Sequence, residues 1–365
     1  MKRLLLWTNL YPTKAAPHYG TFVKSTEHAW RQALGSDNVQ LVAIREKPTS
    51  KLSKIKLYAG LLTRCARSLY NKPTGTLLEV HYPVYFLPLL YLLSLAKPKH
   101  FFLVLRFHGT DLAQIAGSRL FRSLFDKLKG SVDLCVAPSE HFRQQISTQL
   151  NVPLSRIIKV YPDSVGEHFA ASERAAPAAA SEVFTVGCVS RLEPGKNCQT
   201  LVEAFARLTI PNKRLVIVGD GSQRAALEKL ANEVGVSDIT TLTGALPREQ
   251  LPEVLASFSV FVFPSVRESF GLVAVEALAC GVPVIANEKL HAAKEYLQEG
   301  RNGYFYEDGV EGLVTAIETF YAQPEAVRVA LSEQAKNVRH QFSDQQVFTQ
   351  GVNEILSKQQ SEKTC

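Results

Sequence analysis

A short turn near the middle of the chain combines an arginine and a lysine in a way that suits phosphate binding. A strand is expected to end at Arg191, and a glycine-containing turn then delivers Lys196 five residues later. Arginine offers a planar fork of N–H donors and lysine a mobile point charge, a combination that fits a diphosphate. The turn is not a Walker loop, because Asn197 follows Lys196 and the upstream glycine spacing differs. The alternative interpretation is that both cations are solvated or ion-paired.

A second stretch, FVFPSVRESFGLVAVEALACGVPVIA over residues 261–286, predicts a strand, a loop and a helix in quick succession. The strand runs into Pro264, and the helix opens at Gly271. Free backbone N–H groups at a helix N-terminus, beside the carboxyl end of a strand, favour a phosphate or a sugar oxygen. Two carboxylates, Glu268 and Glu276, flank this corner.

Eight residues separate Glu268 from Glu276, and this spacing limits their chemistry. Along a helix they would stand about 12 Å apart and off one another's face. A retaining glycosidase pair needs about 5 Å between its carboxyl groups, so these two do not share one bond locally. They could instead contact two ends of one extended ligand. The alternative for each is a capping or solvated glutamate.

Both stretches belong to a repeating order of strands and helices. The first half alternates strands with helices up to IIKVYP at 157–162, and the second half repeats this order from VFTVGCVSR at 183–191. Apolar, β-branched runs separated by helical patterns are typical of parallel sheets covered on both faces. The sequence therefore predicts an α/β fold with two doubly wound, Rossmann-like parallel-sheet domains and a cleft between them.

Small residues mark the boundary between these domains. The segment AASERAAPAAAS at 170–181 gives little to bury and suits a solvent-exposed connection. We expect one domain over residues 1–172 and the other over residues 182–342. Apolar residues at helical spacing over 343–358 predict a terminal helix, which ends in a polar tail to residue 365 and could dock back on the first domain.

Charge is unevenly divided between the two halves. The chain carries 41 basic and 34 acidic residues, a net charge of +7. Residues 1–180 hold 24 basic and 11 acidic residues, whereas residues 181–365 hold 17 and 23. A positive half attracts an anionic partner: membrane lipid, a phosphorylated substrate or nucleic acid. Nucleic acid is disfavoured, because the sequence has no aromatic-interleaved basic sheet and no zinc-knuckle spacing.

Residues 51–70 form a basic amphipathic pattern in this positive half. One interpretation is a surface helix that packs its apolar stripe on the sheet; the other is a helix at a membrane interface. The two are compatible if some apolar residues stay exposed. The stripe consists of Leu52, Ile55, Tyr58, Leu62, Cys65 and Leu69.

Composition points to a cytoplasmic globular protein. A hydrophobic fraction of 46% and a charged fraction of 21% fit an ordinary packed core. The six cysteines form no CxxC pair and no zinc-like cluster, so reduced thiols are expected. The opening MKRLLLWTNLYP has no cleavage site after it, and no apolar segment reaches the about 20 residues of a membrane-spanning helix.

Taken together, the two chemistry-bearing stretches resemble glycosyltransferase family 4, whose members are retaining nucleotide-sugar enzymes with the GT-B fold. The family fingerprint reads strand, G-R-L-x-x-x-K-like turn, G-x-G, then P-S-x-x-E-x-F-G-x-x-x-x-E-A-x-A-x-G-x-P-V-I-A. It stands nearly complete from Arg191 through Ala286. The first domain is similar through shorter signals at residues 19–24, 81–83 and 106–111.

The resemblance implies a role for each matching residue. The second domain would bind the nucleotide sugar and the first would present the acceptor. Arg191 and Lys196 would hold the leaving diphosphate, and Glu276 would hydrogen-bond the nucleotide ribose. Glu268 and the backbone of Ser269, Phe270, Gly271 and Leu272 would hold sugar hydroxyls. In the first domain, Gly20 would lie near the donor phosphates, His108 would approach the transferred sugar, and Asp111 would support the loop of His108.

The reaction implied is metal-independent transfer from a nucleotide sugar, with no cofactor and with retention of configuration. No Asp-x-Asp motif occurs in the chain. Family members with similar loops build cell-surface polysaccharide or lipopolysaccharide on lipid carriers at the inner face of the membrane, so a lipid-linked glycan acceptor and an anionic membrane surface are expected partners. The loops at 162–166 and 286–295 depart from the family pattern, which leaves the sugar open.

Two other classes of function remain in view. A noncatalytic GT-B subunit would bind a glycan or act as a scaffold without turnover. A nicotinamide-dependent oxidoreductase would use the G-x-G of Gly219 and Gly221, although Arg224 stands where a dinucleotide fingerprint has its third glycine.

Overall fold

The chain folds into two compact units. The computed structural model describes residues 2–13, 20–46, 50–70, 72–95, 101–171 and 183–361. The first unit comprises residues 1–164 and 344–365, and the second comprises residues 165–343. The chain therefore passes between the units at 164/165 and 343/344 rather than within 170–182. Most of the expected connection, residues 172–182, lies outside the described residues.

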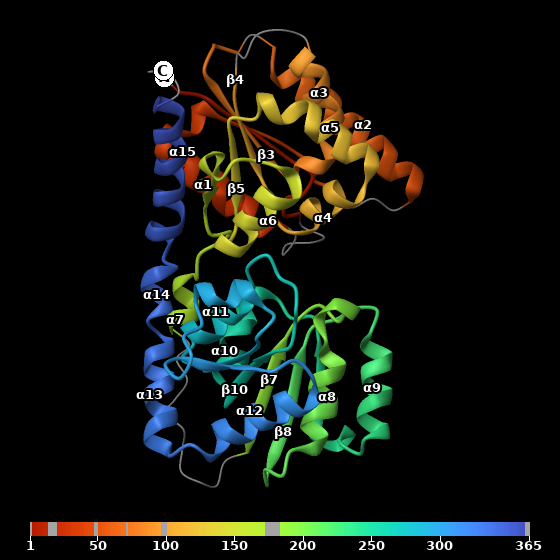
Figure 1. The fold of residues 1–365 in the computed structure, drawn as a ribbon, viewed down its shortest axis with the longest axis vertical. Coiled ribbons are helices and arrows are strands. Elements are labelled where there is room, and N and C mark those ends of the chain that lie inside the picture. The colour runs from red at the N-terminus through yellow and green to blue at the C-terminus, as the bar shows by residue number, and fades with distance from the viewer. Residues whose placement is uncertain are drawn as a thin grey trace. The chain divides into compact units, whose positions relative to one another are not determined.

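The first unit contains a six-stranded parallel sheet (Figure 1). Side chains on its strands alternate between the two faces, so that Leu5 and Trp7 enter one hydrophobic core while Leu4 and Leu6 enter the other. This is why the strands read as unbroken apolar runs. The strand order is β2 (Val39–Ala43), β1 (Leu4–Thr8), β3 (Thr76–His81), β4 (Phe101–Arg106), β5 (Leu134–Ala137) and β6 (Ile157–Lys159).

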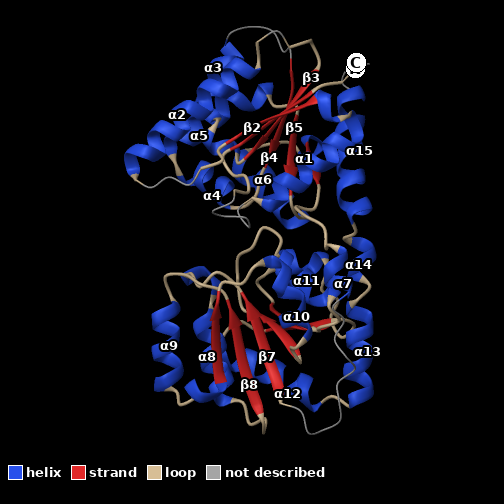
Figure 2. Ribbon diagram, turned by 180° about the vertical axis from the view of Figure 1, so that it is seen from behind, coloured by secondary structure: helices blue, strands red, loops and turns tan. Residues whose placement is uncertain are grey.

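Helices cover both faces of this sheet (Figures 1 and 2). One face carries α1 (Thr21–Leu34) and the C-terminal α15 (Gln350–Ser361). Residues Val352 and Ile355 of α15 join the same core as Trp30 of α1, so the terminal helix belongs to the first unit. The other face carries α2 (Lys51–Ser68), α3 (Leu87–Leu95), α4 (Thr110–Gly117), α5 (Arg119–Leu128) and α6 (Glu140–Leu150).

The apolar stripe predicted over residues 51–70 is buried at one end of helix α2 and exposed at the other. Ser50 caps the helix in a reciprocal capping box with Ser53. Leu61 and Cys65 in its C-terminal half are buried, and Tyr58, Leu62 and Leu69, the residue just after the helix, are partly buried against the same core. Near its N-terminus, Leu52 and Ile55 are 62% and 66% exposed. The helix thus packs on the sheet at one end and exposes apolar side chains at the other.

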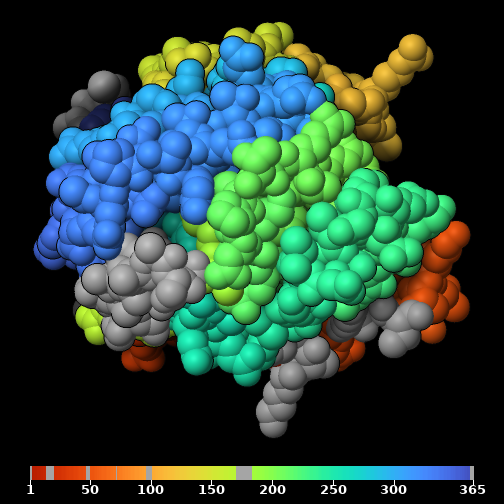
Figure 3. All heavy atoms as spheres, turned by 90° about the horizontal axis from the view of Figure 1, so that it is seen from below, coloured from red at the N-terminus to blue at the C-terminus, as the bar shows by residue number. Residues whose placement is uncertain are grey.

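The second unit repeats the architecture with another six-stranded parallel sheet (Figure 2). Helices α8 (Cys198–Arg207), α9 (Arg224–Glu233) and α12 (Val310–Ala322) lie side by side (Figure 3), and α13 (Glu325–Ala335) adds Leu331 to their core. The other layer includes α10 (Leu251–Ala256) and α11 (Leu272–Ala279), and the shorter α7 (Glu167–Ala171) and α14 (Val338–Gln341) contact α11. The strand order is β12 (Gly303–Tyr306), β11 (Val284–Asn287), β10 (Val260–Phe263), β7 (Phe184–Val189), β8 (Lys213–Val218) and β9 (Thr240–Gly244).

Each sheet has one point at which the chain order reverses. In the second unit it lies between β7 and β10, and in the first between β1 and β3. Open α/β sheets bind ligands beyond the carboxyl ends of their strands at such switch points. The predicted fold class, with two doubly wound parallel sheets of the GT-B type, is confirmed. No described helix combines the length and apolar character that crossing a membrane demands.

Candidate active site

The arginine-lysine turn lies at the switch point of the second unit, directly after β7. Arg191 is exposed, and Lys196 is half-buried at the end of a 3-10 turn over Pro194–Lys196. Asn197 then adopts a left-handed conformation with φ of 53° and opens α8. Asparagine tolerates this conformation better than most residues, which explains how the chain turns from strand to helix at this point.

The G-x-G loop after β8 packs against this turn and supports it. Leu192 N–H donates to the carbonyl of Asp220 at 3.0 Å, and Gln223 N–H donates to the carbonyl of Leu192 at 2.9 Å. A Cβ atom on Gly219 would lie 1.8 Å from the Ser190 carbonyl oxygen. The glycine lets the two backbones approach, which accounts for the G-x-G pattern without a nicotinamide cofactor.

The strand-to-helix corner follows β10 at the same switch point. Gly271 has φ of +96° and precedes α11. A Cβ atom there would lie 2.6 Å from Phe263 Cε1 and 2.7 Å from Tyr296 Oη. Tyr296 Oη in turn donates a hydrogen bond to the Phe270 carbonyl at 3.1 Å. Gly271 and Tyr296 therefore fix the backbone of residues 269–272. The first N–H groups of α11 begin there, and such groups have no hydrogen-bond acceptors within their own helix.

An ion pair joins the turn to the corner. Lys196 Nζ hydrogen-bonds to the carboxylate of Glu268. The side chains are 15% and 20% exposed, so the pair lies at an accessible edge of the unit. Two residues singled out separately from the sequence thus meet in one place, in the ion-paired arrangement that was the alternative for Lys196.

Glu276 is buried and makes its own ion pair with Arg248. Arg248 donates to Oε1 of Glu276 from Nη2 at 2.8 Å and from Nε at 3.1 Å. The guanidinium also lies 5.7 Å from the centre of the Phe169 ring. Arg248 stands in a 3-10 turn over Arg248–Gln250, outside every motif that the sequence offered. Glu268 and Glu276 therefore have different cations as partners.

The predicted residues of the first unit lie at the switch point of its own sheet or beside it. Gly20 has φ of +76° and precedes α1, and a Cβ atom there would lie 3.0 Å from the Leu10 carbonyl carbon. Asp111 is fully buried, and its carboxylate accepts hydrogen bonds from three backbone N–H groups. The N–H of His108 lies 3.1 Å from Oδ1 and 3.0 Å from Oδ2, and those of Gly109 and Leu112 lie 2.8 and 2.9 Å from Oδ1. Burial raises the pKa of Asp111 to about 6, although these N–H groups oppose the shift. Asp111 therefore holds the loop of His108.

His108 is half-buried in a cluster of rings after β4. Its ring centroid lies 4.6 Å from those of Tyr82 and Phe22 and 5.0 Å from that of His81. Tyr82 adopts a left-handed backbone with φ of 56°, which is strained for an aromatic residue. Burial, with His81 and Arg106 nearby, holds the pKa of His108 well below its usual range. His108 is therefore neutral at physiological pH.

A buried carboxylate that the sequence analysis missed lies behind this cluster. Glu79 on β3 accepts a hydrogen bond from Trp30 Nε1 at 2.6 Å and one from Arg106 Nε at 2.5 Å. Burial would raise the pKa of Glu79, but the Arg106 guanidinium and His81 lower it to about 2. Alternate residues of a parallel strand normally enter a core, so β3 gave no local signal for a functional carboxylate.

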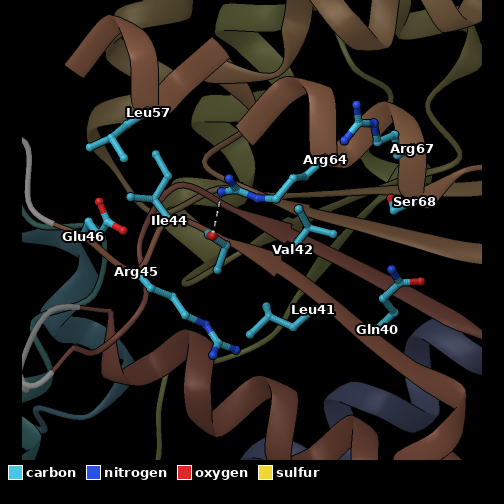
Figure 4. A pocket seen from close by; sticks show the side chains of 11 residues that line it. Gln40, Leu41, Val42, Ile44, Arg45, Glu46, Leu57, Arg64, Arg67 and Ser68 are labelled. Atoms are coloured by element: carbon cyan, nitrogen blue, oxygen red, sulfur yellow. Dashed lines mark hydrogen bonds between the residues drawn. The ribbon is translucent and has the colours of Figure 1, made fainter. Parts of the chain in front are cut away.

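A separate hollow of about 530 Å³ lies beside the edge strand β2 (Figure 4). Arg64 and Arg67 line it from α2, and Arg45 lines it from the segment after β2. Arg64 Nη2 donates to the Ala43 carbonyl at 3.2 Å, and Arg45 points away from the other two arginines (Figure 4). The arginines do not converge on one point, so the hollow is a basic groove rather than a single phosphate site.

The described residues hold no group of three or more His, Cys, Asp and Glu side chains that could bind a metal ion. Among them, Cys65, Cys135, Cys188, Cys198 and Cys280 are free thiols, and all five are buried. Metal independence stays a prediction.

Comparison with known proteins gives a family match for the second unit. Residues 170–338 match the family described as Glycosyl transferases group 1. Over 163 residues the chain is 37% identical to a D-inositol 3-phosphate glycosyltransferase of Mycolicibacterium smegmatis, a match to 42% of this chain and 37% of that protein. Over 150 residues it is 35% identical to a GDP-mannose-dependent alpha-(1-6)-phosphatidylinositol monomannoside mannosyltransferase of the same organism, covering 38% of this chain and 39% of that protein.

The matched segment therefore spans under two fifths of the length of these relatives. Among solved structures, a sucrose-phosphate synthase from Thermosynechococcus elongatus superposes with a TM-score of 0.77 at 17% identity, over 99% of this chain and 100% of that one. At this identity the likeness concerns the fold. The second unit carries a glycosyl transferases group 1 domain, and the predicted resemblance to glycosyltransferase family 4 is confirmed there.

Proposed function

We propose that this chain is a retaining, metal-independent glycosyltransferase that moves a sugar from a nucleotide-sugar donor to a glycan acceptor. The contact of Lys196 with Glu268 carries the proposal. It joins the two elements of the family fingerprint at a switch point, where α/β sheets bind nucleotides. A diphosphate and a sugar on the same ligand would meet a cation and a carboxylate side by side.

In the proposed reaction the second unit binds the donor and stabilises the leaving group. Arg191 and Lys196 hold the diphosphate, and Glu276 accepts a hydrogen bond from the ribose. Breaking the bond from the anomeric carbon to the diphosphate oxygen leaves negative charge on the β-phosphate. Cations aimed at that oxygen stabilise the transition state more than the bound donor and so raise kcat.

The acceptor hydroxyl completes the exchange. Its oxygen bonds to the anomeric carbon on the face from which the phosphate departs, and the leaving phosphate takes its proton. Glu268 and the backbone of residues 269–272 hold the sugar hydroxyls, with Glu268 released from Lys196 as the phosphate takes its place. Because one similar enzyme is GDP-mannose-dependent by name, GDP-mannose is the first donor to test.

The proposed acceptor is a lipid-linked glycan of cell-surface polysaccharide or lipopolysaccharide synthesis, reached at the inner face of the cell membrane. The excess of basic residues in the first half supports an anionic surface as partner. So do the exposed Leu52 and Ile55 on α2, which stand among Lys51, Lys54 and Lys56.

A panel of nucleotide sugars, scored by thermal stabilisation and then by sugar transfer, tests this proposal. A donor that binds the folded state raises its melting temperature. We expect one nucleotide sugar to do so, Lys196→Ala to reduce the shift, and chelation of divalent ions to leave transfer unchanged. Stabilisation by NADH alone would instead indicate an oxidoreductase. Glycan binding without any transfer, unchanged in Lys196→Ala, would indicate a noncatalytic subunit.

A further inference from the structure

Glu79, His81 and His108 form a continuous chain of polar side chains in the first unit. His81 Nε2 lies 3.3 Å from Glu79 Oε1, and His81 Nδ1 lies 3.1 Å from His108 Nε2. Glu79 and His81 are fully buried, whereas His108 is half-buried. These contacts therefore lead from a buried carboxylate, through the buried His81, to His108, which has some access to solvent.

His81 and His108 are both neutral. Burial lowers the pKa of His81, against the opposing effect of Glu79, and burial with His81 and Arg106 lowers the pKa of His108 much further. A neutral imidazole carries one N–H donor and one bare nitrogen acceptor. Only one proton can therefore lie between His81 Nδ1 and His108 Nε2.

The carboxylate decides which nitrogen carries that proton. Glu79 is ionised, and a bare Nε2 on His81 would point its lone pair at negative charge. Within the described residues, His81 Nε2 makes no hydrogen bond of good geometry, so Glu79 acts on this nitrogen through its charge at 3.3 Å and nothing else competes with it. His81 therefore carries its proton on Nε2, its Nδ1 is bare, and His108 must donate from Nε2. The remaining nitrogen of His108, Nδ1, is left as an acceptor.

We propose that Glu79 and His81 are positioning residues that hold His108 in its Nε2–H tautomer, so that His108 Nδ1 accepts a hydrogen bond from a hydroxyl of the sugar substrate. The tautomer follows from the first unit alone, and only the choice of ligand rests on the proposed function. His108 is then neither a general acid nor a cation for the diphosphate. The rings of Tyr82 and Phe22 keep its plane fixed, so Nδ1 points in one direction.

Nitrogen-15 NMR of the full chain labelled in histidine tests the tautomer directly. At pH 7 we expect His108 to bear its proton on Nε2 and to have a bare Nδ1. A proton on Nδ1, or on both nitrogens, would overturn the proposal. In Glu79→Gln the amide can donate as well as accept, so the signals of His81 and His108 should move toward a mixture of tautomers while those of the exposed His340 stay. Unmoved His81 and His108 signals in a folded Glu79→Gln variant would also count against it.

Two substitutions at His81 separate positioning from packing, whether or not Glu79→Gln folds. Asparagine offers an amide oxygen that can accept from His108 Nε2, whereas leucine fills the space without an acceptor. We expect His81→Leu to lower kcat about 10-fold with the donor KM changed by less than about 2-fold, and His81→Asn to retain most of the activity. Equal losses in the two variants would indicate a structural role only. If no donor is ever turned over, the NMR result still decides the tautomer.

Discussion

Lys196 and Glu268 bring together two segments that are 72 residues apart in the sequence. The ion pair keeps the lysine at the carboxyl end of β7, ready for an anion, at the cost that an arriving diphosphate must displace the carboxylate. Both side chains keep some access to solvent, so part of the attraction is screened and the carboxylate of Glu268 can be hydrated when the lysine is removed. The importance of the ion pair is therefore expected in turnover rather than in folding.

Lys196→Ala should lower kcat by about 100-fold, because one charge that stabilises the leaving phosphate is lost. The melting temperature should stay within a few degrees of the wild-type value. Initial rates at saturating donor measure the effect. The matched control is Lys229→Ala, which removes a lysine that is 76% exposed and pairs with Glu233 on α9. A kcat for Lys196→Ala within about twofold of wild type would remove Lys196 from the mechanism.

Arg248→Ala should destabilise the second unit by about 2 to 3 kcal/mol, because Glu276 is buried and loses its cation. Thermal unfolding followed by circular dichroism measures this. Arg207→Ala is the control, since its pair with Glu311 is exposed on both sides and should contribute less than about 1 kcal/mol. In the double variant Arg248→Ala with Glu276→Gln, a loss equal to the sum of the single losses would show that the two side chains are not coupled.

The contribution of Asp111 to the stability of the first unit should fall as pH rises from 4 to 7. The pKa of Asp111 is about 6 in the folded chain against an ordinary value of 3.8. The folded state therefore binds this proton more tightly than the unfolded state, and protonation of Asp111 at low pH stabilises the fold. By linkage, this carboxyl contributes up to about 3 kcal/mol at pH 4 that is lost as pH passes 6. Asp111→Asn should remove that part of the slope.

Denaturant unfolding at several pH values tests the Asp111 prediction, with tryptophan fluorescence as the signal. Both tryptophans, Trp7 and Trp30, lie in the first unit, so the signal reports that unit alone. The quantity to compare is the difference between variant and wild type, because other groups have the opposite dependence. The lowered pKa values of His81 and His108 make their contribution to stability rise with pH in this range, and Glu79 does the same below about pH 4.5. A difference that does not change between pH 4 and pH 7 would contradict the prediction.

Liposomes that contain anionic lipid should bind the protein at low salt and release it at high salt, because the attraction is screened. Leu52→Ser with Ile55→Ser should weaken co-sedimentation by removing exposed apolar side chains of α2. Val327→Ser is the control, since Val327 is also exposed but belongs to the second unit. Equal binding by all three proteins would place the contact away from α2, and no binding at low salt would exclude the surface as a partner.

The sequence was sufficient for the strands that lead into the site and for the residues of the fingerprint. Strands β7 and β10 are continuous apolar runs with a turn signal after each, so the placement of Arg191 and Gly271 could be predicted. Strand β12 does not stand out in the sequence, because its four residues, GYFY, are too short and too aromatic to show a period. Helix α2 was predicted, but which part of its stripe is covered depends on neighbouring elements.

Interactions between distant residues could not be predicted in the same way. Arg248 and Glu276 are 28 residues apart and lie in different elements, and Trp30 and Glu79 are 49 residues apart. Nothing local distinguishes such residues from solvated or core positions. Glu79 in particular stands within an apolar strand, and only the pairing of β3 with β4 brings Arg106 to it.

The return of α15 to the first unit makes the second unit an insertion within the first. A chain that stops at residue 343 would leave the sheet face beside Trp30 uncovered, and a chain that covers only 1–164 would lack the same helix. Gly351 allows α15 to approach Val160 closely, because a Cβ atom on residue 351 would lie only 2.5 Å from Val160 Cγ1. The first unit therefore needs residues 344–365 as well as 1–164 to cover its sheet, and during synthesis this last helix becomes available only after the ribosome has translated the whole of the other unit.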